Sequence, residues 1–284
     1  MNASLTTGDE LGMLVTYNPI AVRVDETLEQ LADRIRTSGF HHWPVVDDSR
    51  RLIGIVSEAD IVRHYAARCA AADVLAGQGG AALNPVLAEE IMSPRVFCIE
   101  MHATRAEVLD RMVRHEIHSL PVVDNGHLVG IVTSTDILRE FSTGELCDNR
   151  EPVSRRMTKT EDWVDAAATL DEARMELVAS GLSYLPVTKG ECPLGVISQR
   201  MLRTAKCHQM LQDALDEQAT PGSDRILSLV QSAPTIKPGE RLTKAAALMV
   251  DYSVQAIAVV SQGSKLFGVI SEDEILRAAL EAMV

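Results

Sequence analysis

Four segments of this 284-residue chain share one pattern: GIVSEADIVR (54–63), GIVTSTDILR (130–139), GVISQRMLR (195–203) and GVISEDEILR (268–277). Each begins with a glycine, continues with two apolar residues and a serine or threonine, and ends on an arginine. A second block precedes each of them: HHWPVVD (41–47), HSLPVVD (118–124), SYLPV (183–187) and QAIAVV (255–260). Two blocks that recur together four times indicate an internal repeat, and this repeat decides the fold.

Each copy is predicted to be a strand, a helix, two strands and a second helix. In the first copy, apolar residues within 28–35 recur at helical spacing. Short β-branched runs follow at 45–46 and 53–56. In the second copy the two runs are joined by Asp124-Asn125-Gly126, which is typical of a tight hairpin. The second helix begins after the serine or threonine of the glycine-led segment.

The four copies are expected to form two pairs, because a unit of about 50–60 residues buries little surface alone. The polar stretch CDNREPVSRR (147–156) contains a proline and is predicted to link the pairs. The predicted boundaries are 11–146 for the first pair (repeats 11–70 and 88–143), 147–156 for the linker, and 157–284 for the second pair (repeats 157–207 and 226–284).

Composition favours a soluble globular protein and argues against several functions. Apolar residues make up 46% and charged residues 24% of the chain, and no apolar run approaches the roughly 18 residues of a membrane helix. A net charge of −13 argues against binding nucleic acid or an anionic membrane. Five cysteines without a C-x-x-C motif, and no secretory signal, favour a cytoplasmic protein. Catalytic motifs are absent, so we expect no enzyme, no metal site and no required cofactor.

With these motifs the chain resembles the cystathionine-β-synthase (CBS) domain family. The matching elements are a Met-Ser/Thr start, as at Met92-Ser93 and Met157-Thr158, the L-P-V-V-D strand, and G-h-h-[ST]-x-x-D, where h is apolar. The resemblance covers roughly residues 11–284. It implies an α/β (α+β) fold of tandem CBS pairs, in which two repeats form a module with pseudo-two-fold symmetry, often called a Bateman module. It also implies adenine nucleotides between paired repeats, and dimers.

The hydroxyl–aspartate pair of each glycine-led segment suits a nucleotide. Ser57 and Thr133 stand where a strand meets a helix, and a helix N-terminus with a hydroxyl favours phosphate. Three residues later, Asp60 and Asp136 offer carboxylates that can accept hydrogen bonds from both ribose hydroxyls. The same [ST]-x-x-D spacing also fits a capping box, in which the two side chains only cap the helix.

The resemblance adds further contacts in the first pair. His42 and His118 precede the proline strand, where family members direct basic side chains at phosphate. Trp43 precedes Pro44 where adenine would stack, although a plain core role is equally compatible with the sequence. The residues expected to line the adenine pockets are Thr16, Ile20, Trp43, Pro44, Ser93, Phe97, Leu120 and Pro121.

The second pair departs from the family pattern. Met201 replaces the aspartate in the third copy, Glu274 replaces it in the fourth, and Ala258 replaces the proline. The second pair is therefore predicted to be degenerate. An arginine recurs two or three residues after each aspartate position and is predicted to be solvated or ion-paired: Arg63, Arg139, Arg203 and Arg277.

The sequence thus predicts a sensor that binds AMP, ADP or ATP in its first pair of repeats and acts on an unknown regulated protein. A homodimer is expected, with no nucleic acid and no membrane as partner. Two alternatives stay open. One is a scaffold that dimerises without any nucleotide. The other is an S-adenosylmethionine-binding CBS protein, which would keep the ribose aspartate but would not need the histidines.

Overall fold

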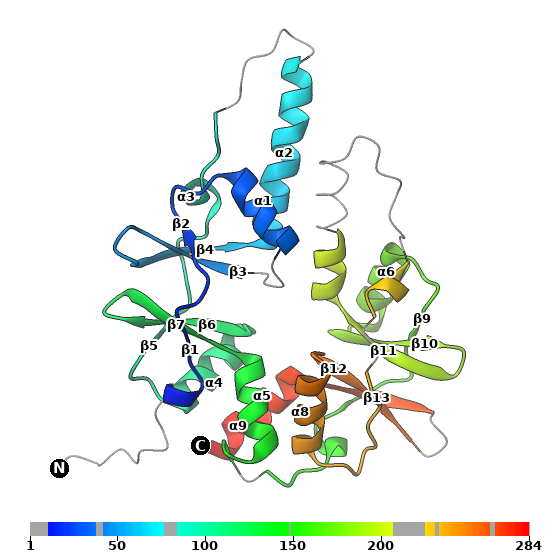
Figure 1. Cartoon of the computed structure of the whole chain (residues 1–284). Helices are drawn as coiled ribbons and strands as arrows, with labels where there is room; N and C mark the ends of the chain where they lie inside the picture. The colour runs from blue at the N-terminus through cyan, green and yellow to red at the C-terminus, as the bar shows by residue number, and fades with distance from the viewer. Residues whose placement is uncertain are drawn as a thin grey trace, which may run out of the picture.

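The computed structural model describes residues 11–37, 42–76, 84–147, 149–206, 225–230, 233–261 and 265–283 (Figure 1). The first two repeats contain η1 (Leu11–Met13), β1 (Thr16–Tyr17), β2 (Val22–Arg23), α1 (Leu28–Thr37), β3 (His42–Val46), β4 (Leu52–Ser57), α2 (Glu58–Ala76), α3 (Ala88–Ile91), β5 (Ile99–Glu100), α4 (Arg105–His115), β6 (Ser119–Asp124), β7 (His127–Thr133) and α5 (Ser134–Thr143).

The last two repeats contain η2 (Val153–Arg155), β8 (Thr158–Lys159), β9 (Val164–Asp165), α6 (Leu170–Ser180), β10 (Tyr184–Lys189), β11 (Cys192–Ser198), η3 (Ile226–Ser228), α8 (Leu242–Asp251), β12 (Ala256–Val260), β13 (Leu266–Ser271) and α9 (Glu272–Met283). Residues 199–206 are also helical. The mixed helices and sheets confirm the predicted fold class of tandem repeats.

Local sequence explains these elements well in the second repeat. Thr104 caps α4 and forms a capping box with Glu107. The hairpin between β6 and β7 turns through Asn125 and Gly126, whose φ angles are 49° and 82°. Two successive positive φ angles are those of the type I′ turn that an Asn-Gly pair favours, so the predicted hairpin is confirmed.

The opening strand of a repeat pairs with the sheet of its partner repeat. β1 of the first repeat runs antiparallel to β7 of the second, with Thr16 opposite Ile131. β8 of the third repeat pairs in the same way with β13 of the fourth. In return, Ser93 of the second repeat forms two hydrogen bonds of 2.9 and 3.0 Å with Ile55 in β4. Paired repeats are therefore joined by strand exchange, which the sequence analysis did not foresee.

The glycines that begin three of the G-h-h-[ST] segments, Gly54, Gly130 and Gly268, lie against the exchanged segments. A Cβ on Gly130 would overlap Val15 and lie 3.2 Å from the Thr16 carbonyl oxygen. A Cβ on Gly54 would overlap Met92 of the second repeat. At Gly130, where a backbone oxygen is among the obstacles, a residue without a side chain allows this close approach of the exchanged segment.

The helices of the second and fourth repeats share one hydrophobic core. α5 packs on α8 and α4 packs on α9, and Figure 1 shows these four helices gathered in the lower middle of the molecule. The side chains of this core are buried in both repeats, as Phe141 and Ile275 illustrate with no exposed surface. The first and third repeats have separate cores of their own among the described residues.

The segment predicted as a linker contains ordered structure. η2 lies within 147–156, Val153 is fully buried, and its N–H donates to the Glu240 carbonyl of the fourth repeat at 2.8 Å. Part of the predicted linker therefore packs against the fourth repeat. α2 continues to Ala76, beyond the predicted end of the first repeat at residue 70. The predicted boundary at residue 207 lies outside the described residues.

Candidate functional site

The hydroxyl–aspartate pairs of the first module adopt capping-box geometry. At the start of α2, Asp60 Oδ2 accepts hydrogen bonds from Ser57 Oγ at 2.6 Å and from Ser57 N–H at 3.1 Å. At the start of α5, Asp136 Oδ2 accepts from Thr133 Oγ1 at 2.6 Å and from Thr133 N–H at 3.0 Å. The sequence allowed both a capping role and a ribose role, and the structure shows the capping geometry at both positions.

The second oxygen of each aspartate faces an arginine one turn along. Arg63 lies 2.7 Å from Asp60 Oδ1, and Arg139 lies 3.2 Å from Asp136 Oδ1. Both arginine side chains are mostly exposed, at 68% and 59%. The prediction that these recurring arginines form salt bridges or solvated faces is confirmed for these two.

Strand exchange decides which predicted residues lie together. The β1 segment lies beside β7, and therefore brings Thr16 close to Thr133, the last residue of that strand. The bridge to Ile55 likewise brings Ser93 close to Ser57 at the end of β4. By their place in these segments we assign the predicted residues to two groups: the Thr133 site, consisting of Thr16, Ile20, His118, Pro121, Thr133 and Asp136, and the Ser57 site, consisting of His42, Pro44, Ser57, Asp60, Ser93 and Phe97.

Each site contains one exposed apolar side chain four residues after the exchanged hydroxyl. Ile20 is 52% exposed and Phe97 is 48% exposed. The Phe97 ring stacks on His115, with ring centroids 4.0 Å apart and planes inclined by 23°. Accessible apolar side chains such as these can contact the face of a planar ring.

Trp43 and Leu120 do not belong to these sites, which corrects their prediction as adenine contacts. Trp43 is opposite Val56 in the β3–β4 hairpin, is 1% exposed, and packs in the core of the first repeat. Leu120 is opposite Val132 and is fully buried in the shared core. Successive side chains of a strand alternate between faces, so these two face the helices while Pro44 and Pro121 face the other side.

The two predicted phosphate-contact histidines differ in their surroundings. His42 begins β3 and is exposed. His118 points toward the second module: its Nδ1 lies 3.2 Å from Glu272 Oε1, and its Nε2 lies 3.8 Å from Asp273 Oδ1. An acidic pair of the fourth repeat therefore faces the histidine of the Thr133 site.

A hollow of about 280 Å³ lies between the third and fourth repeats. Its lining includes Tyr184, Arg200, Met201, Leu229 and Gln255. Burial raises the pKa of Tyr184, and its hydroxyl lies against Asp273. Met201 stands in the position of Asp60 and Asp136 and has no strong hydrogen-bond acceptor for a ribose.

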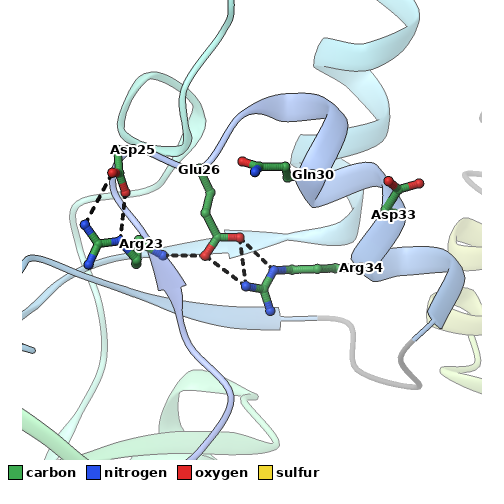
Figure 2. A pocket seen from close by; sticks show the side chains of 6 residues that line it. All are labelled: Arg23, Asp25, Glu26, Gln30, Asp33 and Arg34. Atoms are coloured by element: carbon green, nitrogen blue, oxygen red, sulfur yellow. Dashed lines mark hydrogen bonds and ion pairs between the residues drawn. The ribbon is translucent and has the colours of Figure 1, made fainter.

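A second hollow, of about 550 Å³, lies on the first repeat away from both sites. Figure 2 shows its charged lining along β2 and α1. Arg34 forms two hydrogen bonds of 2.8 Å with Glu26, and Arg23 pairs with Asp25 at 3.0 Å and with Asp48 at 2.7 Å. Because carboxylates of the same repeat neutralise both arginines, we do not include this hollow in the candidate site.

Two buried polar residues next to the Thr133 site were missed by the sequence analysis. Ser134 is the first residue of α5 and Glu272 is the first residue of α9; they are 5% and 2% exposed. Ser134 Oγ donates to Glu272 Oε2 at 2.8 Å. The signal was the position directly after the serine or threonine of each copy, which is occupied by Glu58, Ser134, Gln199 and Glu272.

Among the described residues, two kinds of feature are absent. Within these residues, no three His, Cys, Asp or Glu side chains gather closely enough to hold a metal ion. No helix among the same residues is both long enough and apolar enough to cross a membrane.

Comparison with known proteins gives the following matches. The family model of the CBS domain matches residues 11–67, 88–143 and 228–281. An uncharacterized protein of Methanocaldococcus jannaschii is 21% identical over 278 residues, which is 91% of this chain and 94% of that protein. A crystal structure of an M. jannaschii protein that has been likened to g-AMPK has a TM-score of 0.70 at 18% identity and covers 95% of this chain and 99% of that one.

A shorter match is the 5′-AMP-activated protein kinase subunit gamma-3 of Sus scrofa. It is 34% identical over 97 residues, which is 34% of this chain and 18% of that protein.

Proposed function

Because the chain belongs to the CBS domain family, we propose that its first pair of repeats binds an adenine nucleotide: AMP, ADP or ATP. Binding between two repeats would stabilise one relative orientation of the repeats. A regulated protein would read that orientation, so the chain would act as a sensor and not as an enzyme. A cytoplasmic location and a homodimer complete the proposal.

The observation that supports this proposal best is the strand exchange. It sets a hydroxyl of one repeat beside the hydroxyl–aspartate pair of the other, at the start of a helix. In the Thr133 site, the helix N-terminus and Thr133 would contact phosphate. Asp136 would accept from the ribose hydroxyls, while Ile20 and Pro121 would contact the adenine ring beside Thr16. In the Ser57 site the corresponding residues are Ser57, Asp60, Phe97, Pro44 and Ser93, with His42 near the phosphate.

The capping geometry is compatible with a ribose contact. Asp136 Oδ2 caps the helix, whereas Oδ1 lies 3.2 Å from Arg139, whose side chain is largely exposed. An exposed ion pair contributes about 0–1 kcal/mol, so a ribose hydroxyl can replace it at small expense. The same argument applies to Asp60 and Arg63. Similarity to a kinase subunit named for its activation by 5′-AMP adds support.

A calorimetric titration of the full chain with AMP, ADP, ATP and S-adenosylmethionine tests the proposal. Asp136→Ala should weaken binding at the Thr133 site at least about tenfold, which is about 1.4 kcal/mol. The matched control is Glu107→Ala, because Glu107 also closes a capping box in the second repeat but lies outside the site. Both substitutions should lower stability by about 1 kcal/mol. Only Asp136→Ala should lower affinity.

The remaining outcomes separate the alternatives. Binding of S-adenosylmethionine alone would replace the proposed ligand. If none of the four compounds binds, the aspartates only cap their helices and the nucleotide-independent scaffold is favoured. Binding that is lost in Asp60→Ala but not in Asp136→Ala would restrict the proposal to the Ser57 site. Light scattering of the purified chain tests the homodimer separately.

A further inference from the structure

A carboxylate of the second module lies at the phosphate end of the Thr133 site. Glu272 is 2% exposed although it belongs to α9 of the fourth repeat. Its Oε2 accepts from Ser134 Oγ at 2.8 Å, and its Oε1 lies 3.2 Å from His118 Nδ1. The residues that face it are therefore the first residue of α5 and the histidine predicted to contact phosphate.

This position has the chemistry of an anion site. Ser134 is the first residue of α5 and directly follows Thr133. Its N–H donates to the His118 carbonyl at 2.8 Å, so His118 also lies at the N-terminus of this helix. A helix N-terminus carries a partial positive charge, and a hydroxyl and an imidazole add donors. Here a carboxylate of the same chain meets those donors.

The burial of Glu272 acts on its ionisation. Burial raises the pKa of Glu272 above the ordinary value and so disfavours its charged form, while His118, Ser134 and Arg200 act in the opposite direction and favour it. Asp273 is the second acid of the group, and its Oδ1 lies 3.8 Å from His118 Nε2. Charges in a poorly solvated position interact more strongly than charges in water, so an added anion near Glu272 is repelled.

We propose that Glu272 determines how much negative charge a ligand of the Thr133 site can carry. This inference rests on the proposed adenine-nucleotide binding. Adenosine and AMP would be accepted, because they bring no charge or a single phosphate group. ADP and ATP would be disfavoured, since their additional phosphates would extend along the start of α5 toward the buried carboxylate. The ligand class of this site is thus a nucleoside or nucleoside monophosphate.

The test is a titration of the full chain with adenosine, AMP, ADP and ATP in the Asp60→Ala background, which weakens the Ser57 site. Glu272→Gln removes the charge but keeps an oxygen that can accept from Ser134. It should raise ATP affinity about tenfold or more and change adenosine affinity less than about twofold, a selective gain of about 1.4 kcal/mol. Glu176→Gln, on the exposed surface of α6, makes the same change in net charge and should leave the ligand ranking unchanged.

Asp273→Asn provides a second variant if Glu272→Gln does not fold, because Asp273 is 28% exposed. It should produce a smaller change in the same direction. If Glu272→Gln and Asp273→Asn keep the ranking of the parent chain while adenosine or AMP still binds, the inference is overturned and the proposed function stands. If none of the four ligands binds the chain in either background, the proposed function itself fails.

Discussion

The glycines at the exchanged strands lead to a graded prediction. Alanine at Gly268, Gly130 or Gly54 places a methyl group against the exchanged segment of the partner repeat. At Gly268 the obstacles are backbone atoms: the Thr158 oxygen overlaps the new Cβ, the Thr158 carbonyl carbon lies 3.2 Å away, and Lys159 Cα lies 3.3 Å away. At Gly54 the three nearest atoms all belong to the Met92 side chain.

The expected loss of stability follows from how well each obstacle can move. Overpacking costs about 1–3 kcal/mol, while replacing glycine by alanine returns about 0.4–1 kcal/mol through the unfolded chain. We therefore expect a net loss of about 2 kcal/mol for Gly268→Ala and about 1 kcal/mol for Gly130→Ala. Gly54→Ala should lose less, because the end of the Met92 side chain can rotate away.

Thermal unfolding of the full chain measures this series. For a chain of this size, about 1 kcal/mol shifts Tm by roughly 2–4 °C. Gly239→Ala is the matched control, since a Cβ there meets nothing within 4 Å, and its Tm should stay level or rise. If Gly268→Ala is as stable as Gly239→Ala, the exchanged strand does not require a glycine, and the reasoning fails.

Three other substitutions test separate interactions. Arg105→Ala removes the partner of the Glu140 carboxylate, whose side chain is only 9% exposed. Because a buried charge without its partner is costly, urea unfolding should show a loss of stability of about 3–5 kcal/mol. Glu272→Gln should gain stability relative to wild type as pH rises above 4.5. Burial raises the pKa of Glu272, so the folded wild-type chain disfavours the ionised carboxylate and loses stability over that range. Urea midpoints of both proteins at pH 4.5 and 7.5 measure the difference. Arg156→Ala breaks pairs with Glu151 and with the largely exposed Glu281, and should lose about 1 kcal/mol or less, with a salt-dependent difference from wild type in Tm.

Each of these three predictions can be contradicted by its measurement. Arg105→Ala within 1 kcal/mol of wild type would mean that Glu140 finds other partners. A pH-independent difference for Glu272→Gln would mean that its carboxyl titrates alike in the folded and unfolded chain. A large, salt-independent loss for Arg156→Ala would mean that packing of its stem outweighs the ion pairs.

The sequence was sufficient to predict the repeats and their helices and strands, but not how the repeats pack together. Hydrophobic spacing and the Asn125-Gly126 turn act over a few residues, and the helices and hairpins agree with them. A two-residue strand such as β1 carries no pattern that states which sheet it joins. The shared core of the second and fourth repeats depends on contacts such as α5 with α8, which no local periodicity encodes.

The residue types of the candidate site could be predicted from the sequence, but the faces and partners of its side chains could not. Asp60 and Asp136 were identified from spacing, yet a capping box and a ribose contact require the same residues. The sequence could not assign Trp43 to the core, because the face of a strand residue depends on where the strand begins. The partner of His118 could not be found from the sequence, because Glu272 belongs to the fourth repeat and the whole third repeat lies between them in the chain.

The pairing of Thr16 with Ile131 has a consequence for biosynthesis. When the first repeat leaves the ribosome, its opening strand has no neighbour, because β7 has not yet been made. The edge of this strand stays unpaired until the second repeat emerges. Such long-range pairing is slow, and a chain with an unpaired strand edge is prone to aggregation. The smallest piece of chain that can complete its sheets during translation is thus a pair of repeats, and a stalled chain that ends within the second repeat is a natural substrate for chaperones.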